Sequence, residues 1–159
     1  MKDSISLLHQ FDRRLIDSLY VEAMVLADEA RSFFDHRAEE HRAVLSQIDR
    51  VEFACESLKV TTRLMHIIAW LLTQRAIIHG ELPESSRTDA HHRLGEAAST
   101  PAGMTARFSE EMAGLIGASE DLYQRVARLE RQFVGRADGA LPMPTGPARD
   151  LLTRLERAF

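Results

Sequence analysis

The stretch ESLKVTTRLMHIIAWLLTQRAIIHGEL, Glu56 to Leu82, decides the fold of this chain. Between Leu64 and Leu72 nearly every residue is apolar, and these residues point to all sides of a helix. A helix that is apolar on all sides must be buried on all sides. The apolar run between Arg63 and Arg75 is too short to cross a bilayer, which takes about 20 residues. We therefore expect protein, and not membrane, to cover this helix.

Apolar residues at helical spacing predict three long helices. They cover residues 6 or 12 to 35, Glu39–His79 and Thr105–Val134, and we expect an all-α, antiparallel three-helix bundle with a long central helix. The face expected on the first helix is Phe11, Leu15, Leu19, Ala23, Leu26, Ala30 and Phe33. A seam with alternating spacings of four and three residues follows the second helix through Val44, Ile48, Val51, Cys55, Leu58, Thr62, Met65, Ala69, Leu72 and Ala76. A similar seam follows the third helix through Phe108, Met112, Leu115, Ser119, Leu122, Val126, Leu129 and Phe133.

Glycine and proline mark the parts of the chain that are not long helices. Residues 81–106 are predicted to form a loop with one short helix around Glu84–Leu94. Gly114 and Gly117 fall inside the third helix, where each costs about 1 kcal/mol relative to Ala. We interpret both as positions where a neighbouring helix approaches closely.

The last part of the sequence is predicted to be a linker and a flexible tail. Residues 135–147, GRADGALPMPTGP, are rich in Pro and Gly and separate the bundle, residues 1–134, from the C-terminal residues. Residues 150–159 place Leu151, Leu152, Leu155 and Phe159 on one helical face, too short to be a stable helix alone. This tail either docks on a partner or packs on its own dimer.

Composition and charge exclude several classes of function. The chain has 159 residues, 45% apolar and 28% charged, with a formal net charge of −4, and no run of like charge suggests nucleic-acid binding. The single Cys55 cannot form an intrachain disulfide, and the N-terminus has no signal-peptide pattern. We expect a cytoplasmic protein without nucleic-acid or membrane partners.

No motif predicts catalysis, a metal or a cofactor. A carboxylate-bridged metal bundle needs Glu-x-x-His pairs on facing helices, but Ala38 and Arg63 stand three residues before His41 and His66. Asp89 does precede His92 by three residues, although one such pair falls short of a metal site. No phosphate-binding loop, nucleophile elbow or zinc spacing is present.

The apolar segment of the second helix is the candidate interaction site. Two neighbouring helices cannot cover all of its faces, and pairing of two copies about a two-fold axis is the commonest way to bury such a surface. The residues predicted for this dimer or partner contact are Arg63, Leu64, Ile67, Ile68, Trp70, Leu71, Gln74 and Arg75. The alternative is that the polar members are the solvated edge of a core helix.

Three stretches resemble one bacterial family. They are YVEAMVLADEARSFFD (Tyr20–Asp35), the segment Glu56–Leu82 and LYQRVARLERQF (Leu122–Phe133). Together they are similar to the RcdA family of alphaproteobacteria, named for a regulator of CtrA degradation, and its relatives of unknown function.

The resemblance implies a dimeric three-helix bundle without enzymatic activity. It implies an adaptor that helps deliver cell-cycle regulators to the ClpXP protease, together with a response-regulator partner and a cyclic-di-GMP-binding partner. Family members also have a flexible C-terminal segment that adaptor work requires, and residues 135–159 occupy that place here. The alternative is a helical signalling or structural dimer with other partners.

Overall fold

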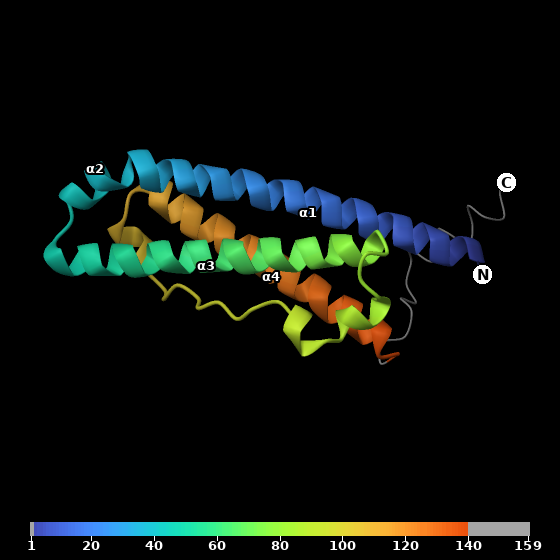
Figure 1. The fold of residues 1–159 in the computed structure, drawn as a ribbon. Coiled ribbons are helices and arrows are strands. Elements are labelled where there is room, and N and C mark those ends of the chain that lie inside the picture. Colours follow the sequence, from blue (N-terminus) through green and yellow to red (C-terminus); the bar gives the residue numbers. More distant parts are fainter. Residues whose placement is uncertain (1, 140–159) are drawn as a thin grey trace, which may run out of the picture.

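The structure, a computed structural model, describes the backbone of residues 2–139 and the side chains of residues 7–139 (Figure 1). This part of the chain forms four α-helices and three short 3-10 helices, without a strand. In chain order they are α1 (Lys2–His36), α2 (Ala38–Ala43), α3 (Gln47–Ile78), η1 (Glu84–Arg87), η2 (Ala90–His92), η3 (Met104–Arg107) and α4 (Glu110–Ala137). The prediction of an all-α fold is confirmed. The predicted tail, with Leu151, Leu152, Leu155 and Phe159, lies outside the described residues.

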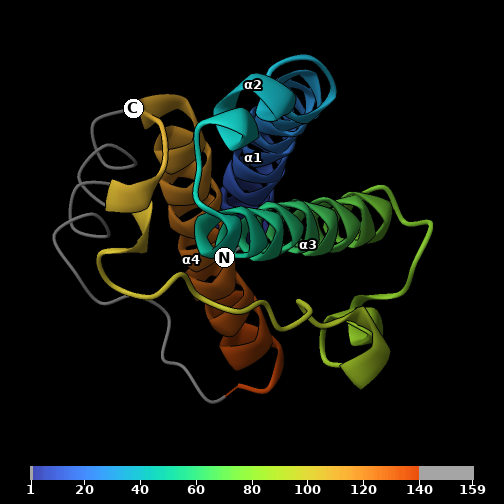
Figure 2. The same cartoon turned by 90° about the vertical axis from the view of Figure 1, so that its left-hand side faces the viewer.

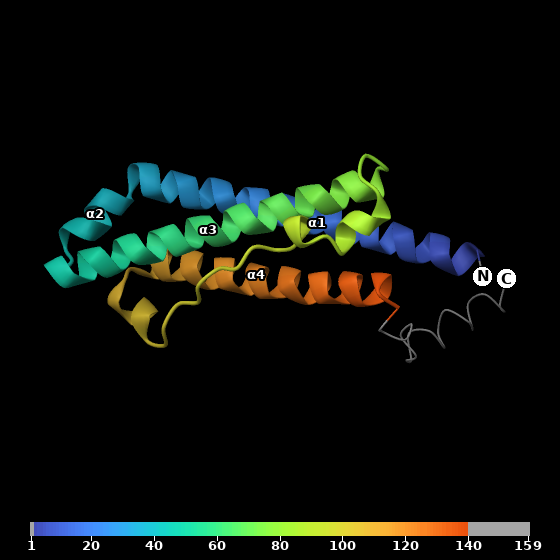
Figure 3. The same ribbon diagram turned by 60° about the horizontal axis from the view of Figure 1, so that its bottom comes forward.

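The three long helices do not all alternate in direction. α1 runs antiparallel to α3 and α4, whereas α3 and α4 run the same way (Figures 1 and 3). Arg136 near the end of α4 pairs with Asp12 near the start of α1, Nη1 to Oδ2 at 3.2 Å. Trp70 and Phe133, late in α3 and α4, have ring centroids 6.0 Å apart. The predicted antiparallel arrangement is therefore wrong for α3 against α4, because residues 79–109 return along the bundle before α4 begins.

The connection between α3 and α4 passes on the side of these helices that faces away from α1 (Figure 2). It contains η1 and η2 where the sequence predicted one short helix around Glu84–Leu94. Between η2 and η3 the residues Arg93–Thr100 form neither helix nor strand. We name Arg93–Thr100 the strap.

A break separates α2 from α3, so the predicted single helix over residues 39–79 is wrong near its start. Ser46 is the N-cap residue of α3, and its Oγ accepts a hydrogen bond from the Asp49 N–H at 3.1 Å. Arg50 Nε donates to the carbonyl oxygen of Arg42, in the last turn of α2, at 3.1 Å. These side chains bond to backbone groups that a helix end leaves unpaired. Each capping interaction of this kind contributes about 1 kcal/mol to stability. In the sequence, the spacing of Ser46 and Asp49 was the sign that a new helix starts here.

The apolar faces predicted for the first and third long helices form most of the core. On α4 the predicted residues Met112, Leu115, Ser119, Leu122, Val126, Leu129 and Phe133 are buried. On α1 the predicted residues Leu19, Ala23, Leu26, Ala30 and Phe33 are buried. Phe11 and Leu15 are exposed instead, and the buried face of α1 begins at Ile16, next to Leu15.

α4 continues to Ala137, past the predicted boundary at Val134. Gly135 therefore belongs to the helix, and Arg136 makes the ion pair with α1 described above. Gly139 comes next after Asp138 with a φ of +65°, a left-handed conformation that glycine adopts without steric cost. Residues 135–137, predicted as the start of the linker, are therefore helical.

Gly114 and Gly117 face solvent, and their predicted close approach to a neighbouring helix is wrong within the described chain. A Cβ placed on either residue would meet no heavy atom within 4 Å. We expect Gly114→Ala and Gly117→Ala each to raise the free energy of unfolding by about 0.5–1 kcal/mol, because Ala loses less backbone freedom in a helix. Urea denaturation of each variant measures this. A loss of stability would mean that another chain packs closely there.

Candidate interaction surface

The outer face of α3 carries a row of apolar side chains that the other helices of the chain leave accessible. We name this row the α3 seam: Ile48, Val51, Cys55, Leu58, Thr62, Met65, Ala69 and Leu72. Leu58 and Met65, in its middle, are 69% and 58% exposed. Spacings that alternate between three and four residues keep the row on one side of the helix. The seam predicted for this helix therefore lies on its solvent side.

The opposite face of α3 is apolar as well, and it is buried in the core. Its apolar residues are Phe53, Val60, Leu64, Ile67, Trp70, Leu71 and Ile77. α3 is therefore apolar on two opposite sides, and the part of the chain that the structure describes covers only one of them. This arrangement accounts for the all-round apolar character of residues 64–72.

Most residues predicted for a contact with a second chain lie inside the single chain. Arg63, Leu64, Ile67, Trp70, Leu71 and Gln74 are buried, and only Ile68 and Arg75 are partly exposed. Arg75 packs on α1, with its Cζ 4.5 Å from the ring centroid of Tyr20. Within residues 64–72 the exposed apolar residues are Met65, Ala69 and Leu72, none of which is in the predicted set. A role of the eight residues in an interface stays a prediction.

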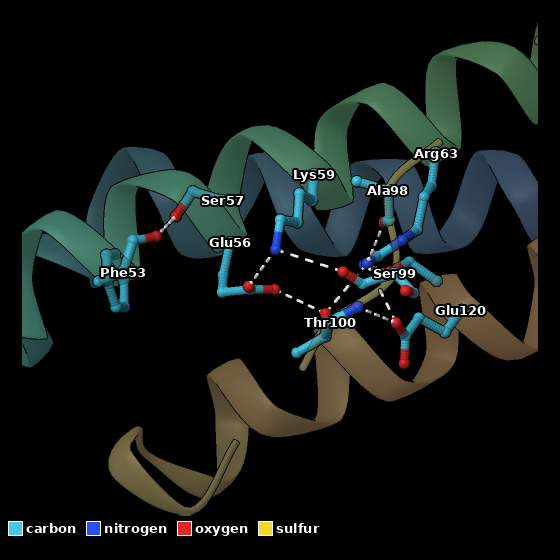
Figure 4. Close-up of polar contacts among 10 residues, drawn as sticks. Phe53, Glu56, Ser57, Lys59, Arg63, Ala98, Ser99, Thr100 and Glu120 are labelled. Atoms are coloured by element: carbon cyan, nitrogen blue, oxygen red, sulfur yellow. Dashed lines mark hydrogen bonds and ion pairs between the residues drawn. The ribbon is translucent and has the colours of Figure 1, made fainter. Parts of the chain in front are cut away.

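A cluster of charged side chains lies between α3, α4 and the strap (Figure 4). Its centre is Arg63, which is 1% exposed. Arg63 Nη1 donates to Ser119 Oγ at 3.2 Å. Arg63 Nη2 donates to the Ala98 carbonyl at 2.7 Å, to Thr100 Oγ1 at 3.0 Å and to Glu120 Oε1 at 3.1 Å. The guanidinium therefore ties α3 to both α4 and the strap.

Glu56 is the second member of this cluster and is fully buried. Its Oε1 accepts from Lys59 Nζ at 2.7 Å, and its Oε2 accepts from Thr100 Oγ1 at 2.6 Å (Figure 4). A buried carboxylate costs free energy unless it is paired and hydrogen-bonded, and both oxygens of Glu56 are. The charged groups are thus committed to partners of the same chain.

A further ion pair joins α1 to α4 on the surface. Arg125 bonds to Glu22 of α1 and to Asp121 of its own helix. The hydrogen bond to Glu22 raises the pKa of the Arg125 guanidinium above its ordinary value, against the lowering effect of burial. Surface pairs of this kind contribute about 0–1 kcal/mol, so this one orients the helices more than it stabilises them.

One open pocket of about 340 Å³ lies between the start of α1, η1 and the end of α4. Its lining consists of Leu8, His9, Asp12, Glu84, Arg87, Phe133, Arg136 and Ala137. Arg87 and Arg136 lie over the ring of Phe133, with Cζ 4.7 and 4.8 Å from its centroid. Their guanidinium groups are paired with Glu84 and Asp12. The lining holds no nucleophile of the Ser, Thr or Cys type.

Two further findings concern the described part of the chain. Within it, no group of three or more His, Cys, Asp or Glu side chains is placed to hold a metal ion. None of the helices in residues 2–139 combines the length and apolar character that a membrane span needs.

Together these features define a helical protein whose most distinctive accessible surface is a row of apolar side chains. Comparison with known families matches residues 8–159 to a family described as "Protein of unknown function (DUF1465)". Among solved structures, the chain is similar to RcdA from Caulobacter crescentus CB15, with 32% identity and a TM-score of 0.60. The similarity covers 75% of this chain and 90% of the RcdA chain. No curated protein matches.

The chain belongs to the DUF1465 family, whose members resemble RcdA. The resemblance to the RcdA family that the three sequence stretches predicted is confirmed.

Proposed function

We propose that this protein is a non-enzymatic adaptor that works as a homodimer and brings other proteins together. The observation that carries the proposal is the α3 seam, an apolar row on the solvent side of the longest core helix after α1. Interaction proteins use such surfaces, because association becomes favourable when a partner covers apolar surface and removes it from water.

A second copy of the chain is the partner that fits the seam best. From Ile48 to Leu72 the row extends about 36 Å along the helix at 1.5 Å per residue. Alternating spacings of three and four residues are the pattern by which two helices interlock their side chains. A two-fold axis would bring the row against itself, so one self-complementary surface suffices. The contact includes the predicted segment 64–72 through Met65, Ile68 and Leu72.

The RcdA resemblance supports the finer part of the proposal. It implies delivery of cell-cycle regulators to the ClpXP protease, with a response-regulator partner and a cyclic-di-GMP-binding partner. In this chain α1 carries further exposed apolar side chains, which are available to such partners while the α3 seam is paired. They are Leu7, Phe11, Leu15, Val21, Met24 and Val25. The same side chains support the alternative, a helical signalling or structural dimer with other partners.

Two measurements test the proposal. Sedimentation of the full chain at about 10 μM should show a dimer, and a monomer at that concentration would reject the homodimer. An affinity pull-down from the native cell identifies the partners. ClpX or a response regulator among the retained proteins supports the adaptor, whereas only unrelated partners would support the alternative.

Truncation after Gly139 tests the proposed docking role of the tail. Because α4 ends at Ala137, this cut leaves all described helices intact. We expect the truncated chain to remain a dimer with a melting temperature within about 2 °C of the full chain, which corresponds to less than about 0.5 kcal/mol. In the pull-down it should retain fewer partners. If truncation lowers stability by several kcal/mol and leaves partner binding intact, the tail instead packs on the bundle.

A further inference from the structure

The solvent side of α3 carries no charge over most of its length. Between residues 53 and 74 the exposed residues are Ala54, Cys55, Leu58, Thr61, Met65, Ala69 and Leu72. The exposed side of a surface helix ordinarily carries charged residues. Lys59, the one Lys, Arg, Asp or Glu of this stretch that is partly exposed, bonds through Nζ to the buried Glu56 at 2.7 Å. The α3 seam therefore offers a partner apolar side chains and no unpaired charge.

The exposed sides of the other two long helices are charged. On α1 they include Arg13, Arg14, Glu22 and Asp28, and on α4 they include Glu110, Asp121, Arg128 and Arg131. A charged group pressed against the seam would lose its water and gain no partner, which costs free energy. Among the long helices of the described chain, only the seam of a second copy therefore matches the seam in charge.

The sizes of the seam residues favour one direction of pairing. The small residues Cys55, Thr62 and Ala69 alternate along the seam with the larger residues Val51, Leu58, Met65 and Leu72. In a parallel pair equal positions meet, so each small residue would face its own copy and leave a gap. In an antiparallel pair each small residue faces a larger one of the partner, which fills the contact as densely as a protein interior.

One register of the antiparallel pair brings the whole α3 seam into contact. In it Ile48 faces the partner's Leu72, Val51 faces the partner's Ala69, Cys55 faces the partner's Met65 and Leu58 faces the partner's Thr62. The two members of each pair lie equally far from the level of Val60, where the two-fold axis crosses the helices. A shift by one repeat of seven residues would leave two residues of each seam without a partner, so less apolar area would be buried.

We propose that two copies pair their α3 seams antiparallel about the level of Val60, so that the dimer has two equivalent ends. This inference rests on the proposed homodimer and specifies its geometry. α4 runs the same way as α3, and Phe133 lies beside Trp70 with ring centroids 6.0 Å apart (Figure 3). Ala137 therefore lies about 20 Å from the axis at 1.5 Å per residue, and the two α4 ends are about 40 Å apart. The chain leaves the bundle at opposite ends of the dimer, which lets one dimer hold two partners at once.

The first test uses Cys55, the single cysteine of the chain, which is exposed. In the proposed pair the two Cys55 residues are ten positions apart along the helices, about 15 Å, whereas a disulfide needs Cα atoms within about 7 Å. Oxidation of the wild-type dimer with diamide should therefore give almost no covalent dimer. Met65→Cys faces the partner's Cys55 and should give at least about ten-fold more covalent dimer on a non-reducing gel.

Two matched variants identify which residues are joined. Met65→Cys combined with Cys55→Ser should lose the cross-link, because the two substituted positions are again about 15 Å apart. Leu72→Cys lies on the same exposed seam but faces the partner's Ile48, so it should not cross-link either.

A distance measurement gives a readout that does not depend on disulfide formation. Spin labels on Ala137→Cys, in the Cys55→Ser background, should lie about 40 Å apart or more. A parallel pair would hold them within about 30 Å, because three helix spacings of about 10 Å separate the two α4 helices.

The remaining outcomes overturn this geometry. A strong cross-link in the wild type, or the shorter label distance, shows a parallel pair, and a cross-link of Leu72→Cys to Cys55 shows a shifted register. A dimer in sedimentation without a cross-link in any variant shows that the copies meet on another surface. In each of these cases the homodimer itself stands. Only a monomer in sedimentation rejects the proposed homodimer and this geometry together.

Discussion

Arg63→Met should lower the free energy of unfolding by about 3–5 kcal/mol, the range for breaking a buried ion pair by removing one partner. Met fills a similar volume and keeps the apolar stem, so the loss reports the guanidinium and not a cavity. Without it, Glu120 loses its ion pair across the cluster, and the Ala98 carbonyl and Ser119 hydroxyl lose a donor. Urea denaturation followed by circular dichroism measures the change.

A matched control tests whether the loss of stability comes from the buried position of Arg63 or from replacing any arginine by methionine. Arg128→Met, on the exposed side of α4, should change stability by less than about 0.5 kcal/mol. Combining Arg63→Met with Glu120→Gln should cost less than the sum of the single changes, because the second change removes the carboxylate that has lost its ion pair. A loss below about 1 kcal/mol for Arg63→Met would contradict a central role of this cluster.

Leu58→Asp should weaken the proposed dimer about 1000-fold without unfolding the chain. Leu58 is 69% exposed in the single chain, so the carboxylate stays in water there. In a dimer paired along the α3 seam, the two-fold axis would bury two carboxylates at about 2 kcal/mol each, and about 4 kcal/mol corresponds to that factor. Sedimentation across a concentration series measures the dissociation constant, and thermal melting at low concentration checks the fold.

Val25→Asp serves as the control for this experiment. Val25 is an exposed apolar residue as well, at 54%, but it lies on α1. The Val25→Asp substitution should leave the dissociation constant of the dimer unchanged. Equal dimerisation of wild type and Leu58→Asp would show that the two copies meet on another surface.

The long helices and the core face of α4 could be predicted from the sequence because each depends on one apolar stripe. On α4 a single seam exists, so it must face the core, and Met112 to Phe133 do so. α3 has two apolar stripes on opposite sides, and periodicity alone does not tell which one its own chain covers. The direction of α4 could not be predicted either, since it depends on the path of residues 79–109.

The contact predicted on the second helix stays a prediction, and which of its side chains are accessible could not be read from the sequence. The 4-then-3 spacing of the seam was visible, whereas the accessibility of Met65 and Leu72 depends on where α1 and the strap lie. Of the charged cluster, Arg63 was singled out from the sequence, but its partners on α4 and the strap were not. Arg63 bonds to Ala98 and Ser119, which are dozens of residues away in the sequence, and a local sequence pattern does not indicate contacts at such separations.

The parallel course of α3 and α4 has a consequence for the order of assembly. α1 and α3 are joined through a short turn that contains α2, so they can associate as a local hairpin. α4 can pair with α3 only after residues 79–109 have closed a large loop. This closure loses chain entropy before the contacts between α3 and α4 form and stabilise the pair. The hairpin of α1 and α3 is therefore the natural first step of folding, with the docking of α4 as the later, slower step.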